Sequence, residues 1–286
     1  MKRFMFIVAA TVIVAACSQN GGVDAVLNDG ARKVASGTQE VVTGIQSVYD
    51  SVGMFHNSAL AYVDSVYGFD SELTIHQCSQ GLADWLIQLD PNDGLNTAAR
   101  DSLVNDAFRG MMEADSLHAL GRKACFDKYP IGNAARSFVD SILLAFDSLS
   151  INGLPSTLAT FVRIENQVVG ATELTDKDEI ALLSGLAVAR YSLEYWWVEL
   201  GVPSKSGADR MKAMAKAEKI AEGDAKGAIT GACAGFVGGA IKGAVVGSIG
   251  GPLGTLGGAC GGAVTSSLSG GVMGAIKGSL SAWLGW

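Results

Sequence analysis

Glycine recurs at every fourth position through the last part of this 286-residue chain, and this rhythm constrains the fold more than any other feature. A first series runs up to a Gly-Gly-Pro sequence, and a second series runs on from it. The first series is Gly227, Gly231, Gly235, Gly239, Gly243, Gly247 and Gly251. The second series is Gly250, Gly254, Gly258, Gly262, Gly270, Gly274 and Gly278, with Ser266 in the remaining step. Steps of four place these small residues along one ridge of an α-helix.

Such a ridge is unfavourable in water and favourable against a second helix. A glycine inside an exposed helix costs about 1 kcal/mol relative to alanine. Small residues allow two helix backbones to approach closely, with a crossing angle of about −40°. Because Gly250-Gly251-Pro252 separates the two series and is typical of a turn, the sequence predicts a glycine-rich helical hairpin over residues 227–286.

The expected hairpin has dimensions that suit a membrane. Each arm would be about 35–43 Å long as a helix, enough to cross a bilayer with tilt. No charge occurs between Gly243 and Ile276, and Trp283 and Trp286 would serve as interfacial anchors. We therefore expect the hairpin to pack in or on a membrane and to self-associate through its glycines. The alternatives are a hairpin buried in the rest of the chain or the core of a soluble oligomer.

The N-terminus has the pattern of an export signal. Lys2 and Arg3 precede an uncharged apolar run over residues 4–16, which is too short to span a bilayer as a helix. The run ends in Val14-Ala15-Ala16-Cys17, which is similar to the lipobox of bacterial lipoproteins. This pattern predicts removal of residues 1–16, lipidation of Cys17 and a polar tether over residues 17–22. The alternative is an ordinary cleavage site in which Cys17 has no role.

The segment from residue 23 to residue 226 is predicted to be a helical bundle, so the chain as a whole is expected to be all-α. Apolar residues recur there at helical spacing, and no alternating strand pattern occurs. Thr175 and Asp178 form a capping box, and Gly201 and Pro203 mark a helix end. A turn is expected at residues 152–155. Helices are predicted over residues 23–55, 82–89, 95–128, 134–149, 157–169 and 176–200, and from about residue 205 into the tail.

Charge divides the chain at about residue 226. Every Asp and Glu lies before this point, and the charged residues beyond it are Lys242 and Lys277. The sequence therefore predicts an acidic helical body over residues 23–226, followed by the tail at 227–286. The formal net charge of −7 argues against a general nucleic-acid binder.

Together, the lipobox and the glycine series resemble the glycine-zipper lipoproteins of Gram-negative envelopes. The resemblance covers residues 2–17 and 227–278 and leaves the body unassigned. It implies an exported protein, lipid-anchored in the bacterial cell envelope, whose hairpin packs in or on a membrane. Because Ser18 rather than aspartate follows the cysteine, the outer membrane is favoured over the inner one. The tail also resembles, more loosely, the insertion hairpin of pore-forming bacteriocins.

Three other groups of residues are candidates for packing or binding. Cys78 and Cys125 are predicted to form a disulfide, with two buried thiols as the alternative. An aromatic group is predicted to pack in the core, with a partner groove as the alternative: Tyr191, Tyr195, Trp196 and Trp197. A lysine series before the tail could touch anionic lipid, although acids are interspersed with it: Lys205, Lys212, Lys216, Lys219 and Lys226. The interspersed acids, which favour a solvated face, are Asp209, Glu218, Glu222 and Asp224.

No catalytic, nucleotide-binding or metal-binding motif occurs in the chain, so we expect a non-enzymatic protein without metal or cofactor. Membrane lipid, another copy of the chain and an unidentified protein partner of the body are the expected partners. The preferred function is an envelope or membrane-interaction component. The rival is a pore-forming or bacteriocin-like antagonism protein that inserts its hairpin into a target membrane.

Overall fold

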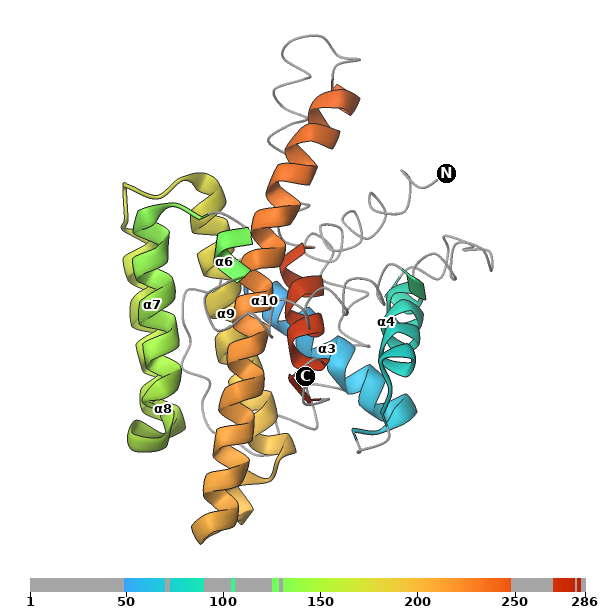
Figure 1. Cartoon of the computed structure of the whole chain (residues 1–286), viewed down its shortest axis with the longest axis vertical. Helices are drawn as coiled ribbons and strands as arrows, with labels where there is room; N and C mark the ends of the chain where they lie inside the picture. Colours follow the sequence, from blue (N-terminus) through green and yellow to red (C-terminus); the bar gives the residue numbers. More distant parts are fainter. Residues whose placement is uncertain are drawn as a thin grey trace.

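The computed structural model describes residues 49–69, 73–89, 104–105, 125–128, 131–247, 270–280 and 282–283. These residues form α-helices and one short 3₁₀ helix, with no strand among them, which confirms the all-α prediction (Figure 1). The elements are α3 (Asp50–Tyr67), α4 (Ile75–Leu89), α6 (Cys125–Lys128), α7 (Asn133–Asp147), α8 (Leu149–Val169), α9 (Asp176–Glu199), η1 (Val202–Ser204) and α10 (Gly207–Gly247). A further helical stretch over residues 270–280 is called the C-terminal segment below.

Helix α9 is the centre of the bundle. It contacts α3, α7, α8 and α10 and buries residues on all of its faces. The predicted cap is present, because the Thr175 hydroxyl accepts a hydrogen bond from the Asp178 backbone N–H at 3.2 Å. The predicted stop is also present: Gly201 takes a left-handed conformation with φ of 63°, which suits glycine after a helix end. Local sequence signals thus fix both ends of the central helix.

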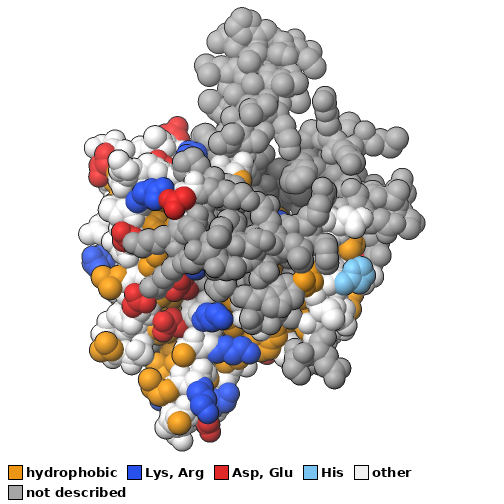
Figure 2. Space-filling view, in the orientation of Figure 1, with side chains coloured by type: hydrophobic (Ala, Val, Ile, Leu, Met, Phe, Trp, Pro, Cys, Tyr) orange, Lys and Arg blue, Asp and Glu red, His pale blue; other side chains and the backbone are white. Residues whose placement is uncertain are grey.

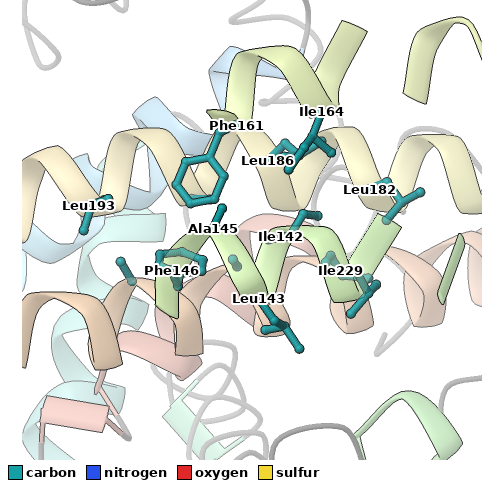
Figure 3. Close-up of a cluster of buried hydrophobic side chains, with 14 of the residues drawn as sticks. Ile142, Leu143, Ala145, Phe146, Phe161, Ile164, Leu182, Leu186, Leu193 and Ile229 are labelled. Atoms are coloured by element: carbon teal, nitrogen blue, oxygen red, sulfur yellow. The ribbon is translucent and has the colours of Figure 1, made fainter. Parts of the chain in front are cut away.

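Helices α7 and α8 form a hairpin against one side of α9. The expected turn within residues 152–155 is a kink, where Gly153 has φ of 75° and α8 continues beyond it. The core between these helices holds Phe146 and Phe161, whose ring centroids are 4.9 Å apart. Figure 3 shows the two rings beside Leu186 of α9 in this apolar cluster. Burying a side chain of this size contributes about 1.5–3 kcal/mol, so large side chains hold these helices together.

A second apolar core lies between α3, α4, α9 and the C-terminal segment. Val52 and Phe55, on the predicted apolar stripe, are buried there. The stripe predicted a helix ending at Phe55, whereas α3 runs to Tyr67 and ends at Gly68, which has φ of 74°. The earlier part of the stripe lies outside the described residues. Helix α4 spans Ile75–Leu89, and the segment over residues 90–94 at which the sequence predicts its end lies outside the described residues.

Helix α10 is 41 residues long and crosses the point at which the composition changes. The boundary drawn at residue 226 therefore falls inside a continuous helix and does not coincide with the end of an element. At about 1.5 Å per residue α10 is about 60 Å long. Its last part extends beyond the ends of α7, α8 and α9 in Figure 1. The connection over residues 248–269 lies outside the described residues, so the complete hairpin stays a prediction.

Candidate functional site

The two glycine series meet where α10 passes the C-terminal segment. The facing pairs are Gly223 with Gly278, Gly227 with Gly274, and Gly231 with Gly270. Residue numbers rise along one helix as they fall along the other, so the two helices are antiparallel. A Cβ atom on Gly227 or Gly274 would lie well inside van der Waals distance of the partner's carbonyl oxygen. Backbone therefore packs directly on backbone, and we call these three pairs the glycine contact.

The remaining members of the two series are only partly placed. Gly235 continues the contact, because its Cα lies 3.4 Å from the position of a Cβ on Gly270. Gly239, Gly243 and Gly247 lie in α10, where their neighbours are outside the described residues. The remaining glycines of the two series lie outside the described residues: Gly250, Gly251, Gly254, Gly258 and Gly262. Sequence reasoning missed Gly223, although a further step of four back from Gly227 would have found it.

A buried polar cluster lies directly beside the glycine contact. It joins His56 of α3, Ser192 of α9, Asp224 of α10 and Ser279 of the C-terminal segment, all with fully buried side chains. His56 Nε2 is 3.0 Å from Ser279 Oγ and 3.4 Å from Asp224 Oδ2. The Ser192 hydroxyl donates a hydrogen bond to Asp224 Oδ2. We call these four residues the polar lock, because they connect three helices to the C-terminal segment.

The polar lock was not found from the sequence. Asp224 was assigned to a solvated charged face, and this was wrong: its exposed fraction is 0%. Asp224 directly follows Gly223, and Ser279 directly follows Gly278. This position next to two facing glycines is the sequence signal that could have identified them. A serine, a histidine and an aspartate are also the residue types of hydrolytic triads. Here they are sealed from solvent and hold elements together, as a structural cluster would.

A second buried charged cluster links α3, α8 and α9. Arg190 Nη2 is 2.6 Å from Asp50 Oδ1 and 3.2 Å from Glu165 Oε1. Burial raises the pKa of the Glu165 carboxyl, an effect that Arg190 opposes and Asp50 reinforces. The pKa of Arg190 is raised as well, because Glu165 and Asp50 together outweigh the opposing effect of burial. Both Glu165 Oε2 and Arg190 Nε are buried without a hydrogen-bond partner among the described residues.

The aromatic group around Trp196 packs in the core, as predicted. Trp196 is fully buried and stacks on Trp283, with centroids 5.2 Å apart and planes at 18°. Phe69 contacts both rings at 5.3 Å. Lys216 Nζ lies 3.5 Å from the centroid of the Trp283 ring. Trp283, expected to be an interfacial anchor, thus packs against the body in this structure, and Trp286 lies outside the described residues.

The cysteines behave as packing residues where they are described. Cys78 is a free thiol with no solvent exposure, so it does not form the predicted disulfide with Cys125 in this structure. Its place in the apolar core explains this, and burial raises the pKa of the thiol to about 12. Cys125 begins α6, and its side chain is outside the described set, as is the lipidation site Cys17. Burial also raises the pKa of Cys233 to about 11.

The lysines before the tail fit a mixed, solvated surface. Figure 2 shows basic side chains interspersed with acidic and apolar ones over the lower end of the molecule, where α10 begins in Figure 1. Lys205, Lys212 and Lys219 are exposed, and Lys226 pairs with Glu222 at 3.2 Å. No uniform basic patch therefore appears on the part of this face that the structure describes.

Within the placed ranges, no helix combines the length and apolar character that crossing a bilayer requires. No group of three His, Cys, Asp or Glu side chains able to hold a metal occurs in the same ranges. Comparison with protein families, with curated proteins and with solved structures finds no significant match.

Proposed function

We propose that this chain is an exported, lipid-anchored and non-enzymatic component of a bacterial envelope. In this proposal Cys17 carries the lipid, the helical body faces the aqueous side, and the glycine-rich tail contacts a membrane. The glycine contact carries the proposal, because it joins the start and the end of the tail to each other at the edge of the body. The stretch between them is free of acids and carries Lys242 as its one charge before Gly270.

The shape of α10 supports a tail that reaches away from the body. One face of its middle part, from Ala213 to Cys233, is buried against the body and the C-terminal segment, whereas its last part extends beyond the neighbouring helices (Figure 1). Glycine and alanine are only weakly apolar, so the tail alone would bind a bilayer weakly. A lipid anchor combined with a weakly apolar contact is a pair of signals that together give stable membrane binding.

Fatty-acid labelling tests the anchor. Cells expressing the full chain would be fed an alkyne fatty acid, and the protein would be captured and probed for label. We expect label on the wild type and none on Cys17→Ala. Equal labelling of the two chains would contradict the proposed anchor.

Carbonate extraction of a chain that begins at Ser18, and therefore lacks both the export signal and the lipidation site, then tests the tail separately. We expect part of this chain to stay with membranes through the tail alone. Adding Val245→Lys and Leu256→Lys should release it, because each charge in an apolar layer is costly. Both positions lie 14 residues along the chain from the nearest glycine of the contact, Gly231 or Gly270, and far-UV circular dichroism would verify that the body keeps its fold. Equal extraction of the chains with and without the two lysines would contradict membrane contact by the tail.

A pore-forming protein is the second candidate, and the close packing of the glycine contact also supports it. A tail that inserts only into a target membrane must first be held by a soluble body, and here both ends of the tail are packed on the body. Release of a trapped dye from liposomes separates the two functions. Leakage at low protein concentration would favour the pore, and binding without leakage would favour the envelope role.

A further inference from the structure

The glycine contact alone does not fix how far the C-terminal segment slides along α10. Glycines recur in steps of four on both helices, so a slide of four residues, about 6 Å, would again place glycine opposite glycine. The buried apolar side chains of the segment repeat with the same step, at Val272, Ile276 and Leu280. Neither of these two rows of side chains therefore distinguishes one register from the next.

A third row of the segment differs at every step, and we call it the graded ridge. Its side chains grow from a hydrogen atom to an indole ring, in the order Gly271, Ala275, Ser279 and Trp283. Gly271 lies close to α9, since a Cβ there would be 3.5 Å from Ser184 Cβ. Ala275 is fully buried in the second apolar core. The small end of the ridge thus fills the places with the least room.

The hydroxyl of Ser279 is matched to one place on the body. It lies 3.0 Å from Nε2 of His56, and both side chains are fully buried. A hydroxyl can donate to this nitrogen or accept from it, so it satisfies the ring in either protonation state. If the segment moved one step so that Gly274 faced Gly223, Ala275 would take this place. The buried nitrogen would then lose its partner, which is unfavourable.

The indole of Trp283 is matched to the next place. It stacks on Trp196 at 5.2 Å and contacts Phe69 at 5.3 Å. The same one-step slide would bring Ser279 here and leave the Trp196 ring without its stacked partner. A slide in the opposite direction would bring Trp283 into the polar lock. The side chains of the lock are fully buried, and forcing a large ring into such a site is unfavourable.

We propose that the graded ridge selects one register from the series that the glycine contact permits, with Ser279 and Trp283 as the deciding side chains. The glycines allow the two backbones to approach without favouring one step over another. A buried polar residue fixes the register of coiled coils in the same way. This inference goes beyond the proposed function and does not depend on lipid anchoring or membrane binding.

Disulfide trapping in the full-length chain reads the register. Ser184→Cys with Gly271→Cys reports the observed register, because the 3.5 Å between the two Cβ positions suits a disulfide. Ser184→Cys with Ser267→Cys reports the one-step slide, since residue 267 would then take the place of residue 271. Both pairs are oxidised under the same conditions, and mass mapping of the linked peptides identifies each bond among the native cysteines.

The ratio of the two disulfides measures the selection. With the natural ridge we expect the bond from 184 to 271 to dominate. Ser279→Ala together with Trp283→Ala makes the ridge nearly uniform, and the yield of the bond from 184 to 267 should then rise at least about tenfold relative to the other. An unchanged ratio in this variant would overturn the proposal.

Leu60→Ala is the matched control, because it removes a buried side chain of α3 from the same apolar core and leaves the segment unaltered. It should lower the yield of the bond from 184 to 271 without raising that of the bond from 184 to 267. An equal rise in Leu60→Ala and in the ridge variant would mean that loosened packing alone permits sliding, and would also overturn the proposal. If the double variant does not fold, Ser279→Ala and Trp283→Ala singly decide the same ratio.

Discussion

Two helix contacts in this bundle are built in opposite ways. Where α8 packs on α7 and α9, Phe146, Phe161 and Leu186 fill the space between the backbones (Figure 3). Where α10 packs on the C-terminal segment, the facing residues are glycines and the backbones touch. Helix α10 uses both modes, because on its other side Ile229 fits against Gly185 of α9.

The difference shows where each contact obtains its stability. The side-chain contact removes large apolar groups from water, so it loses stability when atoms are removed. The glycine contact depends on the close approach of two backbones, so it loses stability when atoms are added. Substitutions that enlarge or truncate residues should therefore have opposite consequences in the two regions.

The largest effect is expected from truncation in the side-chain contact. Phe161→Ala would remove a fully buried ring and leave a cavity beside Phe146. We expect the free energy of unfolding to fall by about 3–5 kcal/mol, measured by chemical denaturation followed by circular dichroism. A loss below about 1 kcal/mol would mean that this core is not close-packed and would break the comparison.

Adding one methyl group to the glycine contact should have the next largest effect. A Cβ at position 274 would collide with the Gly227 carbonyl oxygen, so Gly274→Ala should cost about 1–3 kcal/mol. The neighbouring Gly271→Ala is the matched control. Its Cβ would lie 3.5 Å from Ser184 Cβ and 3.6 Å from the Ala228 oxygen, which is ordinary contact.

The sign of the difference between these two variants decides the test. Gly271→Ala should be neutral or stabilising by up to about 1 kcal/mol, since alanine favours the helix. Denaturation of both variants under the same conditions measures the difference. If the two have the same stability, direct backbone contact is not what holds the C-terminal segment.

A smaller effect on the free energy of unfolding is expected from a substitution in the charged cluster of Asp50, Glu165 and Arg190, which connects α3 to α8 and α9. The pKa of Glu165 is raised, chiefly by burial, so the protonated carboxyl favours the folded state. This contribution is present at acid pH and is lost as the pH rises through the raised pKa. Glu165→Gln should therefore flatten the dependence of unfolding free energy on pH above the ordinary glutamate range. Denaturation series at acid and neutral pH test this, and parallel curves for the two chains would contradict it.

The smallest effect is expected at the exposed edge of the C-terminal contact. Lys216 Nζ sits over the Trp283 ring, and a cation in this position contributes about 0.5–1 kcal/mol at an exposed site. Lys216→Gln should lower stability by no more than this amount, whereas Lys219→Gln, at another exposed lysine of α10, should leave it unchanged. Equal effects of the two substitutions would show that net charge rather than the ring contact is responsible.

Features encoded by neighbouring residues could be predicted from the sequence. Thr175 caps α9 by accepting a hydrogen bond from the backbone of Asp178, three residues further along the chain. Gly201 ends the same helix, and Gly153 introduces the kink in α8, as local turn and cap chemistry requires. The four-residue rhythm likewise predicted a close glycine contact, because it describes a helix face. The extent of α3 was not predicted, because the polar residues after Phe55 obscure its apolar stripe.

Features that depend on distant partners could not be predicted. Asp224 sits among charged residues in the sequence, and its burial follows only once His56, Ser192 and Ser279 converge on it. Trp283 stacks on Trp196, and no rule of sequence spacing relates these two residues. The lipid anchor and the membrane contact stay predictions, because they concern residues and partners outside the described structure.

The hydrogen bond between His56 and Ser279 joins residues 223 positions apart, more than three quarters of the length of the 286-residue chain. A growing polypeptide cannot complete this contact until Ser279 has emerged from the ribosome. Closing so long a loop is also entropically costly and slows folding. The second apolar core, which includes Val272 and Ile276, therefore cannot close before the C-terminal segment has been made, whereas the core between α7, α8 and α9 can close earlier.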